Sequence, residues 1–126
     1  MSLSILAVDD SRTIRDMLNL ALCQAGFSTS LAEDGVHGLE VLDGLRPDAI
    51  ITDINMPRLD GFGFIEAVRG QDEHRATPIL VLTTESAPEL KSRARAAGAT
   101  GWIVKPFDPV KLVRALHMVA GPGAST

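Results

Sequence analysis

The sequence predicts an α/β fold, a doubly wound, five-stranded parallel sheet with five helices. Three observations support this prediction. Short apolar runs alternate with amphipathic segments five times along the 126 residues. The runs are almost continuously apolar, which is typical of strands covered on both faces of a sheet. Gly, Pro or acidic residues separate the segments, and right-handed crossovers leave few topologies for five such units.

Five strands are expected where the apolar runs lie. Their ranges are 3–8, 27–32, 48–52, 78–82 and 101–104. The first run (LSILAV) and the fourth (PILVL) have the length of a buried strand, whereas the second run has the weakest pattern.

Helices are expected between and after these strands, and each has a start signal. The signals are Ser11 for the first helix, Asp34 for the second, 86–89 (SAPE) for the fourth and 108–109 (DP) for the fifth, and 55–57 (NMP) breaks the chain before the third. The fourth signal has the spacing of a capping box with proline in the first turn, which predicts that the helix starts at Ser86. Gly26 and Gly98 are expected to end the first and fourth helices.

Composition limits the classes of protein to which the chain can belong. A hydrophobic content of 45% fits one domain with a real core, expected over residues 1–120, followed by a mobile tail at 121–126. The formal net charge of −4 argues against nucleic acid as a partner. No signal peptide and no apolar run of roughly 20 residues is seen, so we expect a soluble cytoplasmic protein without membrane insertion.

Cysteine and histidine give no sign of a metal site or a disulfide. Cys23 is the single cysteine and lies in an apolar helical stretch, so we expect a small buried side chain. The three histidines lack metal-ligand spacing and are expected at or near the surface; they are His37, His74 and His117.

The most informative feature is the acidic pair Asp9-Asp10, which directly follows the first strand. Adjacent like charges repel each other, and a hard divalent cation such as Mg²⁺ would neutralise them. The alternative interpretation is that both acids merely cap the next helix, at its positive end.

Polar residues end the other strands as well. Asp53 follows the third strand, Thr83 the fourth and Lys105 the fifth. Because parallel strands place their carboxyl ends at one edge of the sheet, where open α/β sheets bind ligands, these groups should converge. Carboxylates hold Mg²⁺, an aspartate can act as nucleophile, and lysine and threonine can contact phosphoryl oxygens, so the set suits phosphoryl transfer.

Four motifs in this order resemble the response-regulator receiver domain, in particular its stand-alone chemotaxis (CheY-like) type. They are Asp9-Asp10, 53–61 (DINMPRLDG), 83–85 (TTE) and 101–107 (GWIVKPF). The resemblance covers essentially the whole chain. It implies the flavodoxin-like strand order 2-1-3-4-5.

The resemblance also implies roles for the residues at the sheet edge. Asp53 would be the phosphoacceptor, and Lys105 would pair with it at rest and with the phosphoryl group afterwards. Asp10, Asp53 and the backbone carbonyl of Asn55 would bind Mg²⁺ directly, and Asp9 would bind it through water. The structural alternatives are that Asp53 is a helix cap and Lys105 a solvated lysine.

Further roles fall on the residues around this set. Thr83 would turn its hydroxyl to the phosphoryl group, although threonine is also ordinary at a strand end. Backbone N–H groups near Asn55 and Thr84 would complete the phosphoryl cradle, and the side chains of Asn55 and Glu85 would tune its lifetime. The Lys105–Pro106 peptide bond is cis in this family, fixing the turn that aims the lysine.

One position departs from the family pattern. Trp102 stands where the family usually has the tyrosine or phenylalanine that turns inward when the threonine shifts. Tryptophan is larger, and a close-packed interior resists added volume. Trp102 is therefore expected either to switch in a restricted way or to stay partly exposed as an interface anchor.

The function implied is a phosphorylation switch of a two-component system. A histidine kinase would phosphorylate Asp53 with Mg²⁺, and the face of the fourth helix, fifth strand and fifth helix would then bind a partner, the flagellar motor switch in chemotaxis. No output domain follows, so a separate protein would receive the signal, and we expect a monomer.

Two alternatives remain. The chain could be a phosphate sink or phosphorelay intermediate of the same fold. It could also be an aspartyl-phosphate phosphatase, but haloacid-dehalogenase-like enzymes have an acid where this chain has Asn55. We therefore expect a phosphoacceptor domain and no enzyme beyond self-phosphorylation and self-dephosphorylation.

Overall fold

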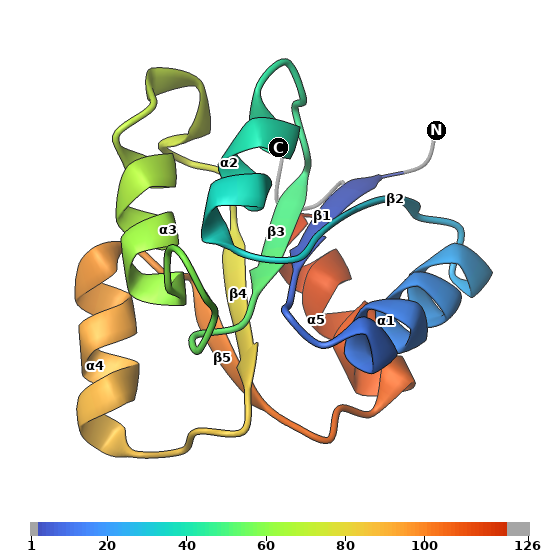
Figure 1. Cartoon of the computed structure of the whole chain (residues 1–126). Helices are drawn as coiled ribbons and strands as arrows, with labels where there is room; N and C mark the ends of the chain where they lie inside the picture. The colour runs from blue at the N-terminus through green and yellow to red at the C-terminus, as the bar shows by residue number, and fades with distance from the viewer. Residues whose placement is uncertain (1–2, 121–126) are drawn as a thin grey trace.

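The computed structural model describes residues 3–120, which form one parallel sheet and the helices around it (Figure 1). The strands are β1 (Ser4–Val8), β2 (Ser28–Ala32), β3 (Ala49–Thr52), β4 (Ile79–Thr83) and β5 (Gly101–Val104). The helices are α1 (Arg12–Gln24), α2 (Gly35–Leu42), α3 (Gly61–Arg69), the 3₁₀ turn η1 (Asp72–His74), α4 (Pro88–Ala97) and α5 (Pro109–Ala120). The predicted tail, 121–126, lies outside the described residues.

The strand order is β2-β1-β3-β4-β5 with every pair parallel, which confirms the predicted fold. Val8 lies opposite both Ala32 and Thr52, and Thr83 lies opposite Val104. The last residues of β1, β2 and β3 are therefore in register, whereas Thr52 lies opposite Val81, so that β4 and β5 extend two residues further at the same edge of the sheet. The connections that leave β4 and β5 run along the lower side of the molecule in Figure 1.

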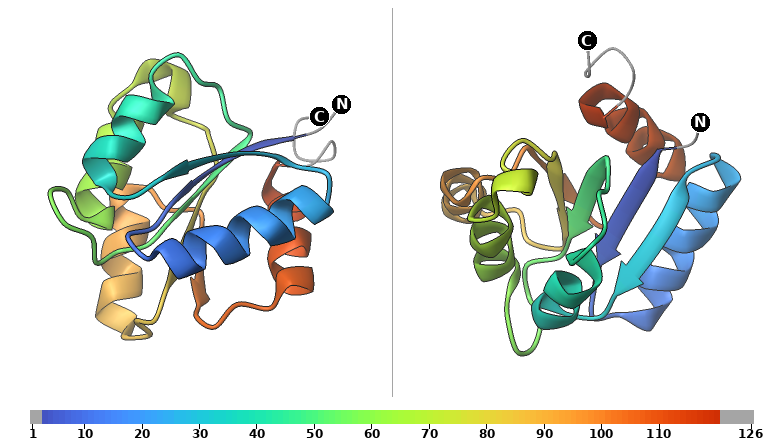
Figure 2. Two further views of the ribbon diagram at one scale, coloured as in Figure 1. Left: turned by 45° about the vertical axis from the view of Figure 1, so that its right-hand side comes forward. Right: turned by 90° about the horizontal axis from the view of Figure 1, so that it is seen from above.

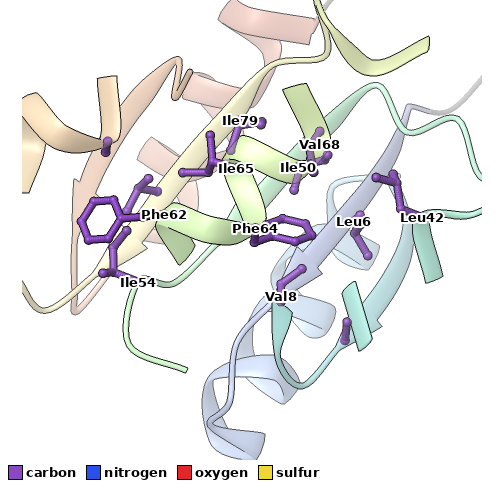
Figure 3. Close-up of a cluster of buried hydrophobic side chains, with 13 residues drawn as sticks. Leu6, Val8, Leu42, Ile50, Ile54, Phe62, Phe64, Ile65, Val68 and Ile79 are labelled. Carbon is purple, nitrogen blue, oxygen red and sulfur yellow. The ribbon is translucent and has the colours of Figure 1, made fainter. Parts of the chain in front are cut away.

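The two faces of the sheet carry separate hydrophobic cores. Helices α2, α3 and α4 cover one face, and α1 and α5 cover the other (Figure 2). Successive strand residues alternate between the cores: Leu6 and Val8 of β1 face α2 and α3, whereas Ile5 and Ala7 face α1 and α5. Figure 3 shows the first core, in which Phe64 lies beside Val8. Burial on both faces explains why the strands are continuously apolar.

The start of α4 differs from the prediction. Ser86 is not the helix cap; Ala87 occupies that position in an extended conformation, and no side chain caps the helix. The reason is that Pro88 disfavours a helical conformation for the residue before it, so the helix begins at Pro88 itself. Gly98 ends the helix as predicted.

Two side chains lie where the sequence did not predict them. Cys23 is exposed, because the buried face of α1 is formed by Leu18 and Leu22 and the next residue is turned about 100° away. His74 is only 3% exposed, because η1 folds back onto α3, where Arg69 donates a 2.8 Å hydrogen bond to the His74 carbonyl. Both expectations were wrong.

Within residues 3–120, every helix is too short or too polar to cross a membrane.

Gly61, the first residue of α3, allows a close approach between α3 and the loop that follows β3. A Cβ atom there would overlap the carbonyl oxygen of Asp53 and lie 2.8 Å from Cα of Ile54. The Gly61 amide donates a 2.8 Å hydrogen bond to the Ile54 carbonyl, so the backbone cannot simply move away.

We expect Gly61→Ala to lower the free energy of unfolding by about 2 kcal/mol, as overpacking typically does. Urea denaturation measures the change. Gly70→Ala is the matched control, because a Cβ there meets its nearest atoms at 3.5 Å and should change stability by less than about 0.5 kcal/mol. Equal effects of the two substitutions would contradict the packing explanation.

Candidate functional site

The site is built from residues that extend the strands by one position. The Asp9 amide donates to the Ala32 carbonyl at 3.0 Å, and the Asp53 amide donates to the Val8 carbonyl at 3.0 Å. In the same way, the Lys105 amide donates to the Thr83 carbonyl at 2.7 Å. Each residue is therefore held by a backbone hydrogen bond to the neighbouring strand, so the sheet fixes the position of its backbone.

Lys105 joins the two buried carboxylates. Its ammonium nitrogen lies 2.8 Å from Oδ2 of Asp9 and 2.9 Å from Oδ2 of Asp53. The side chains are 10% exposed for Lys105, 1% for Asp9 and 10% for Asp53. The predicted pair with Asp53 is present, whereas the pair with Asp9 was not expected, because nothing in sequence spacing shows how far a lysine from β5 reaches.

The environment shifts the ionisation of both partners. Burial raises the pKa of Asp9, and the hydrogen bonds from Lys105 and from the Ser11 amide offset this only in part. Burial alone would lower the pKa of Lys105, but its bonds to Asp9 and Asp53 outweigh this and raise it. Lys105 therefore stays charged at neutral pH.

The acidic residues form a group that fits a hard cation. Asp9, Asp10 and Asp53 each offer one carboxylate oxygen, and these oxygens lie within 4.8 Å of one another. Asp10 is exposed, whereas the other two are buried. Asn55 lies two residues after Asp53. No residue within 3–120 donates a hydrogen bond to its backbone carbonyl. Carboxylate and carbonyl oxygens are the donor set that Mg²⁺ prefers.

The loop that follows β4 supplies the next groups. Thr83 is fully buried, and its hydroxyl accepts a 3.3 Å hydrogen bond from the Glu85 amide. Thr84 is exposed at the same edge of the sheet. The structure thus places the predicted cradle residues at the ends of β3 and β4. The Lys105–Pro106 bond is cis, as the family resemblance implied.

Trp102 is half-buried and fastened to this loop. Its indole N–H donates a 3.0 Å hydrogen bond to the Glu85 carbonyl, and its ring packs against the core beneath α3 and α4. The β4–α4 loop therefore lies between Thr83 and Trp102 and bonds to both side chains. One side of Trp102 lines a groove between β5 and α5, together with Val104, Pro106 and Lys111.

The sequence reasoning also missed a second ion pair near this edge. Arg58, in the loop after β3, donates two hydrogen bonds to Asp34, in the loop after β2. Asp34 was predicted only as a helix cap, a role that it also has, since it accepts from the His37 amide at 2.8 Å. Its place after a strand could have suggested a position near the site, but no local pattern links it to Arg58.

Comparison with known proteins agrees with this geometry. The family model of the response regulator receiver domain matches residues 5–117. The response regulator MprA of Mycobacterium tuberculosis (strain H37Rv) is 41% identical over 107 residues, 85% of this chain and 46% of MprA. The chain thus spans less than half the length of the curated relatives that it matches.

Solved structures resemble the whole domain. Vibrio cholerae chemotaxis protein CheY4 superimposes with a TM-score of 0.91 at 47% identity, covering 94% of this chain and 99% of that one. The receiver domain of the sensor histidine kinase PA1611 from Pseudomonas aeruginosa superimposes with a TM-score of 0.89 at 28% identity, and the match covers 96% of this chain and 99% of that one. That structure has a magnesium ion coordinated in its active-site cleft. The matched family, the fold and the acidic cluster agree, and the chain belongs to the response regulator receiver domain family.

Proposed function

We propose that a histidine kinase phosphorylates Asp53 and that the phosphoryl group switches the face formed by α4, β5 and α5. The observation that carries this proposal is the position of Asp53. Its side chain is 10% exposed at the carboxyl edge of the sheet, and Lys105 contacts one of its oxygens. Asp9 and Asp10 lie close enough to share one metal ion with it. A group that receives a phosphoryl needs such access together with charge neutralisation.

The transfer needs little from the protein besides positioning. A carboxylate oxygen of Asp53 forms the new bond to phosphorus while the bond to the donor imidazole nitrogen breaks, and that nitrogen leaves with the electron pair. Asp10, Asp53 and the Asn55 carbonyl would hold Mg²⁺ directly, and Asp9 would hold it through water. When bound, the cation neutralises phosphoryl charge. Lys105 stabilises the phosphoryl oxygens from the other side.

The readout would pass through the loop after β4. The Thr83 hydroxyl would turn from the Glu85 amide towards a phosphoryl oxygen, which releases one of the two bonds that now hold the loop. Helix α4 is the element most able to respond, because Ala94 is its only buried residue and its principal contacts are with α3. Movement of α4 would reshape the pocket that Lys91 and Arg95 of α4 line together with Trp102 of β5.

A chemotaxis role, with the flagellar motor switch as partner, is our proposal for the output. The likeness to CheY4 supports it, because the match covers 99% of that chain at 47% identity. MprA is a less similar relative, and this chain matches only 46% of it. A phosphate sink or phosphorelay intermediate would use the same site without this output partner.

The phosphoacceptor assignment predicts that Asp53→Asn abolishes labelling by acetyl phosphate with Mg²⁺, because an amide cannot form the acyl phosphate. Mass spectrometry of the intact protein measures the label. Trp102 is the only tryptophan and no tyrosine is present, so its emission should change on labelling of the wild type alone.

Asp60→Asn is the matched control for this experiment. Asp60 is an exposed aspartate in the same loop, and its side chain caps α3 through the Gly63 amide, a bond that asparagine can also make. This variant should be labelled like the wild type. Label that persists on Asp53→Asn would refute the assignment.

The output assignment predicts that the labelled protein binds motor switch protein at least tenfold more tightly than the unlabelled protein. Lys111→Glu, in the groove between β5 and α5, should weaken this binding without changing the labelling. Arg114→Glu changes an exposed α5 residue that does not line the groove, and it serves as the control. Binding that does not depend on phosphorylation would favour the phosphate sink.

A further inference from the structure

Arg58 adopts a backbone conformation that arginine rarely takes. Its φ is +67°, the single positive φ outside glycine among residues 3–120. This left-handed conformation brings Cβ close to the carbonyl oxygen, so the surrounding structure must hold the residue in place. The conformation lies in the eight-residue connection between β3 and α3, which starts at Asp53 and contains Asn55.

A two-fold hydrogen bond to Asp34 supplies that hold. Nε of Arg58 lies 2.8 Å from Oδ2 of Asp34, and Nη2 lies 3.0 Å from Oδ1. The Asp34 side chain is 5% exposed and also accepts the His37 amide, so it is itself fixed at the start of α2. Planar, two-fold pairs of this kind add geometric specificity as well as attraction.

Backbone contact joins the same two loops. The Gly35 amide donates to the Leu59 carbonyl at 3.2 Å, and a Cβ on Gly35 would overlap that carbonyl oxygen. The loop after β3 therefore lies directly against the start of α2, as the right-hand view of Figure 2 shows.

The contacts of Arg58 with Asp34 and of Leu59 with Gly35 hold the middle of the loop, which makes no hydrogen bond to the sheet. At its ends the loop is held by the bond from Asp53 to Val8 and by the bond from Gly61 to the Ile54 carbonyl. Between these points lies Asn55, and Arg58 follows it by three residues. Asp34 in turn lies two residues after Ala32, whose carbonyl accepts the Asp9 amide.

We propose that the Asp34–Arg58 pair is a positioning clamp for the cation site: it holds the loop after β3 so that the Asn55 carbonyl faces the carboxylates of Asp9, Asp10 and Asp53. Neither residue of the clamp is a metal ligand. The inference rests on the proposed function, since it concerns the Mg²⁺ site assigned there.

Arg58→Gly is the sharpest test, because two explanations predict opposite results. Loss of a positive charge near an acidic site should by itself strengthen Mg²⁺ binding. Loss of the clamp should weaken it, by roughly tenfold for a residue that orients metal ligands. Glycine also tolerates the left-handed conformation, so the substitution adds no backbone strain.

The Mg²⁺ dissociation constant is measured by isothermal titration calorimetry of the full chain without phosphodonor. Arg58→Asn, which also tolerates this conformation, should weaken binding to a similar extent. Arg75→Ala is the matched control, because it removes an equal charge and breaks the 2.9 Å pair with Asp72 on η1; its dissociation constant should stay within twofold. Asp10→Ala, which removes a proposed ligand, should bind more weakly still.

A second readout does not depend on the metal. Hydrogen exchange of the Gly61 amide in metal-free protein should be faster in both Arg58 variants and unchanged in Arg75→Ala. Arg58 variants that bind Mg²⁺ as tightly as the wild type, or more tightly, would overturn the clamp while leaving the proposed function intact. A wild type that binds no Mg²⁺ would overturn both.

Discussion

The shared cation at the edge of the sheet is the interaction on which the site depends. Lys105 lies between Asp9 and Asp53 at 2.8 and 2.9 Å, and both carboxylates are nearly buried. Without that ammonium, two desolvated carboxylates would face each other with no positive charge between them, which costs stability. The site also has a third acid, Asp10, and therefore a net excess of negative charge. Such an arrangement is poised to take up a cation, and the rest of the fold serves to hold it.

Both the strands and the loops position the residues of the site. Ladder hydrogen bonds fix Asp9, Asp53 and Lys105, so the backbone positions of these groups follow from the sheet. The loops hold what the ladders cannot reach. Glu85 bonds to Thr83 through its amide and to Trp102 through its carbonyl, which connects the site to the groove beside α5. On the opposite side, the clamp of Asp34 and Arg58 joins the loops after β2 and β3.

Stability and function make different demands on these elements. The central strands and α3 bury large side chains in both cores, which makes them a rigid frame. Helix α4 has a single buried residue and lacks a side-chain cap, so it is the helix least firmly attached to that frame. A switch needs an element of this kind, because a signal of a few kcal/mol cannot reorganise a well-packed core. Local packing thus agrees with the output face that we propose.

The sequence alone determined the fold and the residues of the edge. Continuously apolar strands require a sheet covered on both faces, and strand ends at Asp9, Asp53 and Lys105 require a common edge, because side-chain periodicity and parallel topology are local and general constraints. The tertiary structure alone decided how the side chains meet. It gave Lys105 a second partner in Asp9, moved the start of α4 from Ser86, exposed Cys23 and joined Arg58 to Asp34 across 24 residues. These contacts depend on side-chain conformation and on the path of the loops, and residue spacing in the sequence predicts neither.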